Sequence, residues 1–171
     1  EPYRRQRQMC IRDSSYTGEV LKTTEDSYTV AEISSFQLET VHEFHPVVSA
    51  ILNITPDHLN RHHTMECYAH TKERIAKNQN KSDVCVLNME DEELYRFGKE
   101  CSASVVWFSS RRKPCKGAYL DGNNIRYTDG VTDKIMLNVH DMNLLGTHNY
   151  ENVCAAIAMT KAVGIPDDII I

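Results

Sequence analysis

Residues 47–54 read V-V-S-A-I-L-N-I, a continuous apolar run that decides the fold of this chain. An unbroken apolar run of this length is typical of a strand buried on both faces of a parallel sheet. Residues 84–87 and 104–108 are predicted to be two further short strands. Because helical patterns separate the strands, we predict an α/β fold with a mostly parallel sheet flanked by helices.

Further elements are predicted on either side of this run. Residues 27–33, S-Y-T-V-A-E-I, predict an upstream strand that ends in an acidic residue and a Ser-Ser turn. One helix is expected over residues 64–78 with Thr64 as its N-cap, and the last helix over residues 149–163. The remaining expected elements are a hairpin over residues 118–128 and a strand over residues 134–139.

The composition excludes several classes of protein. The chain has 171 residues, of which 41% are hydrophobic, which suffices for one domain with a buried core. Its formal net charge of −5 argues against general binding to nucleic acids or anionic membranes. No apolar run approaches the ~20 residues that span a bilayer. The six cysteines form no C-x-x-C pair, so we expect reduced thiols in a cytoplasmic protein.

The two ends of the chain are expected to differ from its middle. Residues 1–14 carry four arginines without any periodic pattern, and there is no initial methionine. We therefore expect a foreign or disordered segment at the start of an incomplete sequence. Residues 15–165 should form one domain, and residues 166–171 should begin a connection to a further domain.

Four polar clusters lie at strand ends and helix starts, where α/β folds bind ligands. They are E-I-S-S-F-Q-L-E over residues 32–39, N-I-T-P-D-H-L-N-R-H-H over residues 53–63, Tyr68-x-x-x-Lys72, and L-G-T-H-N-Y-E-N over residues 145–152. A carboxylate after a buried strand needs a cation or a donor, and an imidazole can bind a divalent ion. Tyr68 and Lys72 share one helical face. Two amides, at Asn149 and Asn152, can read a base edge.

Each cluster also has an explanation that involves no function. Glu32 can be satisfied by backbone amides of the turn, Lys72 can be a solvated surface charge, and Asn149 can cap the last helix. Three histidines over residues 58–63 also suggest zinc, although no paired cysteine accompanies them. Spacing alone leaves these alternatives open.

In this order, the four clusters resemble the motifs of the Mur ligase family. The resemblance rests on E-x-S-S-F-Q-L-E, N-x-T-x-D-H-x-x-R, Y-x-x-x-K and G-x-H-N-x-x-N, and it extends over residues 32–152. It implies an incomplete central ATP-binding domain of such a ligase, with a P-loop NTPase-like sheet and an added antiparallel hairpin. Within the family, the S-S-F-Q-L-E string looks like that of the enzymes that add D-glutamate.

The resemblance implies an ATP-dependent ligase of peptidoglycan biosynthesis. Such an enzyme joins UDP-N-acetylmuramoyl-L-alanine to D-glutamate and is expected to be a cytoplasmic monomer when full length. ATP would phosphorylate the substrate carboxylate, and the amine of D-glutamate would then displace phosphate from the acyl phosphate. Two Mg²⁺ ions and cationic groups would offset the crowded negative charge.

The motifs also imply roles for individual residues. Glu32 matches a ligand of the Mg²⁺ ion that bridges the β- and γ-phosphates of ATP, and His58 matches a ligand of the second Mg²⁺ ion. Lys72 matches a lysine that becomes a carbamate and so an anionic oxygen ligand. Substrate-binding positions match Ser34 and Gln37, and adenine-binding positions match Asn149 and Asn152. Supporting roles are expected for Asp57, Arg61 and Tyr68.

The chain departs from the family at the phosphate loop. A G-x-x-G-K-[ST] segment should precede Glu32, yet Gly18 is the only glycine before that residue. The backbone amides and the lysine of such a loop hold the nucleotide phosphates. We therefore expect the 171-residue chain by itself to have no ligase activity.

Two other functions remain open from the sequence. A non-catalytic nucleotide-binding module derived from a Mur ligase would explain the missing phosphate loop. A metal-dependent hydrolase would instead use Glu32, His58 and the neighbouring histidines around a single metal ion with an open water position. The hydrolase would cleave esters or phosphates without ATP.

Overall fold

The computed structural model describes residues 18, 23–24, 27–144 and 146–170. The chain divides into two compact units, residues 1–34 and residues 35–171. The segment over residues 1–14, expected to be foreign or disordered, lies outside the described residues.

In the first unit, residues 27–33 form neither a strand nor a helix, so the prediction of a strand there is wrong. The side chains of Tyr28 and Val30 are exposed, Val30 to 87%. A strand is stable only when a neighbouring strand satisfies its backbone N–H and C=O groups. No strand of the described ranges pairs with residues 27–33, so their β-forming side chains have no ladder to join.

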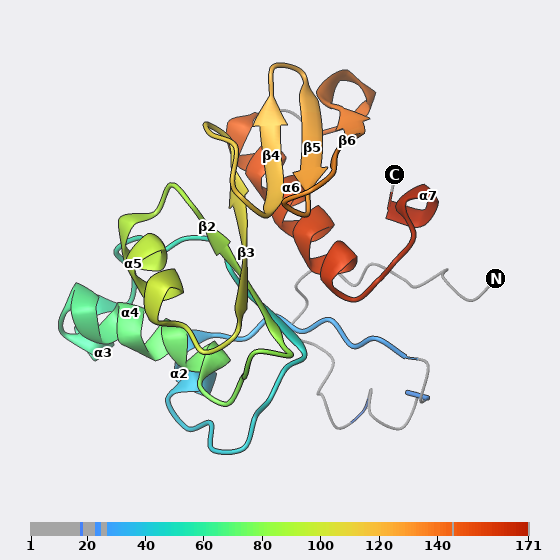
Figure 1. The fold of residues 1–171 in the computed structure, drawn as a ribbon. Helices are drawn as coiled ribbons and strands as arrows, with labels where there is room; N and C mark the ends of the chain where they lie inside the picture. The colour runs from blue at the N-terminus through green and yellow to red at the C-terminus, as the bar shows by residue number, and fades with distance from the viewer. Residues whose placement is uncertain (1–17, 19–22, 25–26, 145, 171) are drawn as a thin grey trace. The chain divides into compact units, whose positions relative to one another are not determined.

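The second unit is built on one six-stranded sheet whose spatial order follows the chain, β1-β2-β3-β4-β5-β6 (Figure 1). The strands are β1 (Val48–Ile51), β2 (Val84–Asn88), β3 (Ser104–Ser109), β4 (Gly117–Asp121), β5 (Asn124–Thr128) and β6 (Asp133–Asn138). The first four strands are parallel, and β4, β5 and β6 pair antiparallel. The predicted parallel sheet with an added antiparallel hairpin is confirmed.

Helices cover both faces of this sheet. They are α2 (Ser35–Leu38), α3 (Leu59–His62), α4 (Met65–Glu73), α5 (Glu92–Glu100), α6 (Thr147–Ala162) and α7 (Asp167–Ile170), with 3-10 turns at Arg74–Ala76 and Val139–Asp141. Successive residues of a strand point to opposite faces. In β2, Val86 packs into the core under α6, whereas Cys85 and Leu87 pack into the core under α4 and α5. Figure 1 shows α4 and α5 on one side of β2 and β3, and α6 on the other.

The apolar run over residues 47–54 forms β1, but this strand is shorter and less buried than predicted. Only Val48–Ile51 is a strand, and along it half-buried and buried residues alternate. Val47 and Leu52 on either side are exposed. The physical reason is position, because β1 is at one end of the described sheet and has β2 as its one neighbour there. The strand that is buried on both faces is β2, which has a neighbouring strand at each of its edges.

The other predicted elements are confirmed with shifted ends. Thr64 caps α4, since its hydroxyl accepts a hydrogen bond from the Cys67 N–H at 3.1 Å. The last helix begins two residues earlier than predicted, with Gly146 at its N-cap at a positive φ of 101°. Asn149 therefore lies inside the first turn, and the explanation of Asn149 as a cap is wrong.

Helix α5 is an element that the sequence analysis does not predict. Asp91 is its N-cap, and the carboxylate accepts a hydrogen bond from the Leu94 N–H at 3.1 Å. The signal was an acidic start, D-E-E, that complements the helix dipole. Among the described residues, no helix is both long and apolar enough to cross a membrane.

Candidate active site

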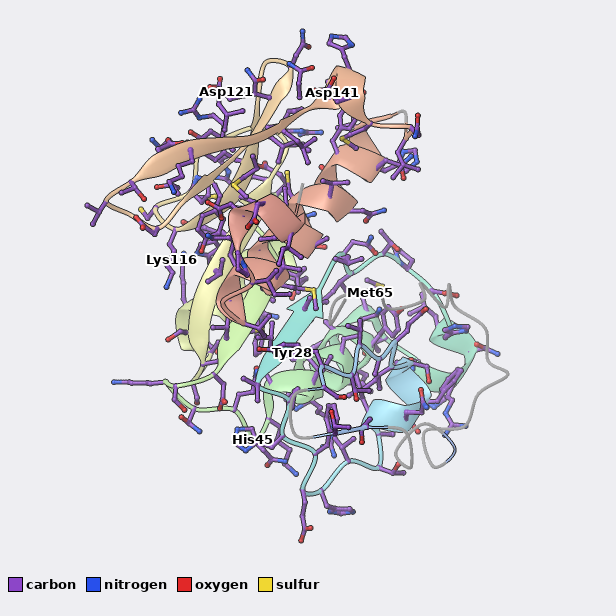
Figure 2. The ribbon with its side chains drawn as sticks, turned by 90° about the vertical axis from the view of Figure 1, so that its right-hand side faces the viewer. Tyr28, His45, Met65, Lys116, Asp121 and Asp141 are labelled. Atoms are coloured by element: carbon purple, nitrogen blue, oxygen red, sulfur yellow. The ribbon has the colours of Figure 1, made fainter. Side chains whose placement is uncertain are left out.

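Three of the four motif segments meet on one side of the second unit. α2 carries the S-F-Q-L residues, α3 follows the histidine-containing loop, and α4 carries the Y-x-x-x-K residues. α4 packs against both α2 and α3. Met65, labelled in Figure 2, marks the start of α4 in this region. Side chains far apart in the sequence are thus brought together, and their contacts define the candidate site.

A row of rings joins the two residues expected to act at the metal. The ring centroids of His58 and Phe36 are 4.9 Å apart. The Phe36 ring stacks on His62 at 5.8 Å, and His62 contacts Tyr68 at 5.2 Å. The Lys72 ammonium lies 5.2 Å from the Tyr68 ring centroid, a cation–π contact. His58 and Lys72 therefore lie at the two ends of one packed row, which we call the ring row.

His62 is the centre of the ring row and is buried, with 5% of its surface exposed. Its Nε2 is 3.0 Å from the Ser35 hydroxyl oxygen, a side-chain hydrogen bond that crosses from α3 to α2. Its Nδ1 is 3.7 Å from Glu39 Oε1. A buried polar side chain is stable only when it is hydrogen-bonded. His62 thus ties α2 to α3 with a specific contact as well as with apolar packing.

Arg61 and Glu39 form a second tie between the same helices. The guanidinium donates two hydrogen bonds to the carboxylate, at 3.0 and 2.6 Å, and lies over the Phe36 ring, 5.0 Å from its centroid. The hydrogen bond from Arg61 is the main cause that lowers the pKa of Glu39, and the same bond raises the pKa of Arg61. Both groups are therefore charged at neutral pH, as a bidentate pair requires.

Arg74 closes the carboxyl end of α2. Its guanidinium donates to the backbone carbonyls of Leu38 at 2.8 Å, Glu39 at 3.3 Å and Val41 at 3.1 Å. The last carbonyls of a helix lack partners within the helix, and cationic side chains are favourable there. This arginine, which follows Lys72 by two residues, holds the short α2 against the end of α4.

The loop that carries His58 is fixed from the sheet side. The Asp91 carboxylate accepts the Ile54 N–H at 2.7 Å, and the Asn88 amide donates to the Leu52 carbonyl at 3.1 Å. At its far end His58 has a left-handed backbone, φ 52°, which is uncommon outside glycine. Its own N–H donates to Asp57 Oδ1 at 2.8 Å. The structure holds a strained residue at this point, as functional sites often do.

The donor chemistry at Asp57 and His58 fits a divalent cation. Their side chains are 62% and 48% exposed, and His58 Nε2 lies 3.3 Å from Asp57 Oδ2. The Asp57 carboxylate is a hard oxygen ligand of the kind that Mg²⁺ prefers, and the His58 imidazole adds a nitrogen ligand that divalent transition-metal ions accept. Lys72 as a free ammonium has no lone pair to offer, so only its carbamate would add an oxygen ligand.

The structure argues against the zinc site and the hydrolase built on neighbouring histidines. The His62 imidazole points into the core toward Ser35, whereas His63 is exposed. Within the described residues no group of three or more His, Cys, Asp or Glu side chains is placed to hold a metal. The three imidazoles over residues 58–63 therefore do not converge.

The remaining predicted site residues are Glu32, Ser34, Gln37, Asn149 and Asn152. Glu32 and Ser34 belong to the first unit. Gln37 is on α2 with its side chain exposed. Asn149 and Asn152 are on α6, one half-buried and the other exposed, on the opposite face of the sheet from α4.

Sequence reasoning missed four residues of the site. Phe36, Glu39, His62 and Arg74 appear in the sequence only as members of motifs or of a helix, and no spacing rule singles them out. The sequence does carry a signal for Phe36, because a phenylalanine within a polar segment is expected to pack against an apolar neighbour. Arg61 and Tyr68 were expected to have supporting roles, and both contact the ring row.

Comparisons with known proteins identify the family of the chain. A family model described as "Mur ligase middle domain" matches residues 14–160. Over 158 residues the chain is 80% identical to the UDP-N-acetylmuramoylalanine--D-glutamate ligase of Lachnospira eligens, covering 92% of this chain and 35% of that protein. Over 155 residues it is 50% identical to the protein of the same name from Lachnoclostridium phytofermentans, covering 91% and 34%. The chain thus spans about a third of the length of these relatives.

Solved structures agree on the fold alone. A crystal structure of MurF from Acinetobacter baumannii has a TM-score of 0.57 at 18% identity and covers 73% of this chain and 27% of that one. The UDP-N-acetylmuramate:L-alanyl-gamma-D-glutamyl-meso-diaminopimelate ligase of Neisseria meningitides has a TM-score of 0.56 at 18% identity, covering 73% and 38%.

Proposed function

The chain belongs to the Mur ligase family, whose middle domain it matches, and on this premise we propose that the whole protein is an ATP-dependent D-glutamate ligase of peptidoglycan synthesis. Its substrates are UDP-N-acetylmuramoyl-L-alanine, D-glutamate and ATP. The observation that carries the proposal is the high identity to a relative that bears this name. The enzyme is a cytoplasmic monomer when complete.

The same proposal divides the chain into parts. Residues 15–165 are middle-domain sequence, and residues 166–171 begin the connection to a further domain. Residues 1–14 do not belong to this domain. The family model supports the middle-domain part, since its match runs from residue 14 to residue 160.

The reaction forms an amide through an acyl phosphate. A carboxylate oxygen of UDP-N-acetylmuramoyl-L-alanine attacks the γ-phosphorus of ATP and releases ADP. The amine of D-glutamate then attacks the acyl carbon, and the tetrahedral intermediate expels phosphate. Two Mg²⁺ ions supply charge stabilisation for the phosphoryl oxygens in this type of reaction. The protein must hold several anionic groups close together without water between them.

The residues of the chain divide this work between them. Glu32 and His58 would each hold one Mg²⁺ ion, and Lys72, as a carbamate, would supply an oxygen ligand in place of a cation. The ring row connects His58 to Lys72, and its two rings nearest Lys72, His62 and Tyr68, are each 5% exposed and therefore firmly packed. The Asp57 carboxylate, hydrogen-bonded to the His58 N–H, orients the left-handed turn.

Two further groups bind the organic parts of the substrates. Ser34 and Gln37 contact the muramoyl substrate, and the exposed side chain of Gln37 on α2 is accessible for this role. Asn149 and Asn152 lie three residues apart on α6 and so face the same way, which suits recognition of an adenine edge by two amides.

A ligase assay on the complete protein tests the proposal. The complete gene is expressed, and D-glutamate-dependent phosphate release is measured together with the dipeptide product by mass spectrometry. We expect both to require ATP, Mg²⁺ and UDP-N-acetylmuramoyl-L-alanine, and D-alanine to be a poor replacement for D-glutamate. The 171-residue chain is the matched control and should show no turnover.

Two results would contradict the proposal. Product formation with another amino acid at a higher kcat/KM would assign the protein to a different member of the family. Nucleotide binding without amide formation by the complete protein would favour the non-catalytic module instead.

A further inference from the structure

Side chains that follow α4 hold the connection between α2 and β1 by its backbone. Arg74 donates to three carbonyls at the end of α2, of which the nearest is that of Leu38 at 2.8 Å. The Asn78 amide donates to two later carbonyls, those of His42 at 2.8 Å and Phe44 at 2.9 Å. We call Arg74 and Asn78 the backbone clamp. Since each of these bonds ends on a carbonyl, the clamp fixes the course of the chain.

The two members of the backbone clamp hold different parts of this connection. Leu38 is the last residue of α2 and is buried. Arg74 therefore binds the helix itself together with the residues that follow it. Asn78 binds only carbonyls beyond the end of α2, the first of them that of His42. Loss of Asn78 should loosen the connection alone, whereas loss of Arg74 should also loosen α2.

α2 depends on such outside support because it is a single turn. It has four residues, Ser35–Leu38, and the Glu39 N–H closes it by donating to the Ser35 carbonyl at 3.1 Å. Forming an isolated helical turn is unfavourable, because several backbone dihedrals are fixed for one hydrogen bond. The turn carries Gln37, whose exposed side chain is proposed to bind the muramoyl substrate. The place of Gln37 is therefore set by contacts from other elements.

Arg74 also relates this turn to Lys72. Lys72 lies in the last turn of α4, and Arg74 is the C-cap of that helix, two residues later. At a rise of about 1.5 Å per residue, the two backbones are about 3 Å apart along the helix axis. α4 packs against α2, as Figure 1 shows. The hydrogen bonds of Arg74 thus connect the helix that carries Lys72 to the turn that carries Gln37.

We propose that Arg74 is a positioning residue of the ligase, which holds Gln37 at the place relative to Lys72 that the muramoyl substrate requires. The inference rests on the proposed function, from which Gln37 and Lys72 take their roles. Arg74 acts through the backbone of α2 and needs no contact with the substrate. Its loss should therefore weaken the binding of UDP-N-acetylmuramoyl-L-alanine and spare that of ATP, whose proposed adenine contacts lie on α6.

The guanidinium is suited to this role by its shape. Arg74 uses two nitrogens, Nε for the Leu38 carbonyl and Nη2 for the two carbonyls that follow. Arginine presents its donors in a rigid plane, whereas a lysine ammonium is a single point on a flexible stem. Arg74→Lys should therefore keep the charge and restore only part of the positioning.

Steady-state kinetics of the complete protein test this role. The KM for each of the three substrates and kcat are measured for the parent, Arg74→Ala, Arg74→Lys and Asn78→Ala. We expect Arg74→Ala to raise the KM for UDP-N-acetylmuramoyl-L-alanine about tenfold and Arg74→Lys to raise it about threefold, while the KM for ATP stays within about twofold. Calorimetric titration with UDP-N-acetylmuramoyl-L-alanine should give Kd values in the same order.

Asn78→Ala is the matched control, because it removes two hydrogen bonds from the same connection and leaves the end of α2 bound. It should lower the Tm as Arg74→Ala does and keep all three KM values near those of the parent. An equal rise in the KM for UDP-N-acetylmuramoyl-L-alanine in Asn78→Ala, or no rise in Arg74→Lys, would overturn the positioning role. If Arg74→Ala does not fold, the comparison of Arg74→Lys with Asn78→Ala still decides. Absence of ligation by the parent would refute the proposed function itself.

Discussion

A histidine at position 62 places an imidazole where a core would ordinarily hold an apolar ring. The side chain stacks on Phe36 and contacts Tyr68, yet it also shares a hydrogen bond with the Ser35 hydroxyl. An apolar ring would keep the stacking and lose the hydrogen bond between α2 and α3. At the scale of single residues, position 62 therefore controls how well His58 and Lys72 are held.

Replacement of His62 should lower the free energy of unfolding, by more in His62→Ala than in His62→Phe. We expect His62→Ala to cost about 2–4 kcal/mol, because it leaves a cavity and an unpaired Ser35 hydroxyl. His62→Phe should cost less, about 1–3 kcal/mol, because it leaves the Ser35 hydroxyl unpaired but fills the cavity with a ring. Urea unfolding followed by circular dichroism measures both values.

His70→Ala is the matched control for these variants. The His70 side chain is 80% exposed on α4, so its loss should change the free energy of unfolding by less than about 0.5 kcal/mol. If His62→Ala were as mild as this control, the central place of His62 in the ring row would be refuted.

At the scale of elements, the antiparallel extension depends on the turn between β5 and β6. Asp129 accepts hydrogen bonds from the Val131 N–H at 2.8 Å, the Thr132 N–H at 2.7 Å and the Thr132 hydroxyl at 2.9 Å. The Thr132 N–H is the main cause that lowers the pKa of Asp129 to about 2. The turn therefore favours the ionised carboxylate.

The contribution of Asp129 to stability should depend on pH in a defined direction. Because the folded pKa is the lower one, the contribution is full above the unfolded pKa of about 3.9 and is lost as the pH falls toward 2. We expect the difference in free energy of unfolding between the parent chain and Asp129→Ala to be largest near pH 6 and to shrink toward pH 2. Urea titrations at several pH values measure it.

Asp129→Asn separates charge from geometry at this turn. It keeps an oxygen acceptor for the two backbone amides, so its deficit should be smaller than that of Asp129→Ala at every pH. Because neither variant titrates at position 129, both deficits should shrink by the same amount toward pH 2. A deficit of Asp129→Ala that did not change between pH 6 and pH 2 would be inconsistent with an ionised turn carboxylate.

At the scale of the whole molecule, the proposed ligase needs more than the chain provides. The chain spans about a third of its relatives, and the second unit brings three of the motif segments together on the α4 side of its sheet. Glu32 belongs to the first unit, and the two amides of α6 that are proposed to bind adenine are on the other face of the sheet from α4. Catalysis is therefore a property of the assembled protein and must be measured on it.

Removal of the Lys72 amine should abolish ligation by the complete protein without unfolding it. We expect Lys72→Ala to lower kcat by at least about 100-fold, because a charge-stabilising group at the phosphoryl site is lost. The cation–π contact with Tyr68 contributes only about 0.5–1 kcal/mol, so the Tm should change little. Lys77→Ala, at an exposed position after α4, is the control and should keep its activity. Full activity of Lys72→Ala would exclude the carbamate role.

Much of the fold could be predicted because its signals are local. Apolar runs and turn residues predicted β2, β3, the hairpin and β6, and the Thr64 cap predicted where α4 begins. The segment over residues 27–33 misled the prediction, because β-forming residues become a strand only when a partner is present. Helix α5 was not predicted, although its N-cap is clear in the sequence, because its apolar pattern is short and lies between two predicted strands.

The sequence by itself determined the family, the α/β class and the identity of the residues with chemical potential, because these depend on motif order and on the periods of apolar residues. The tertiary structure alone decided which of those residues are neighbours. His62 turns into the core and leaves no histidine cluster for zinc, and Phe36 and Tyr68 join His58 to Lys72. The physical reason is that helix packing sets contacts across 20 or more residues of sequence, over which no local pattern carries information.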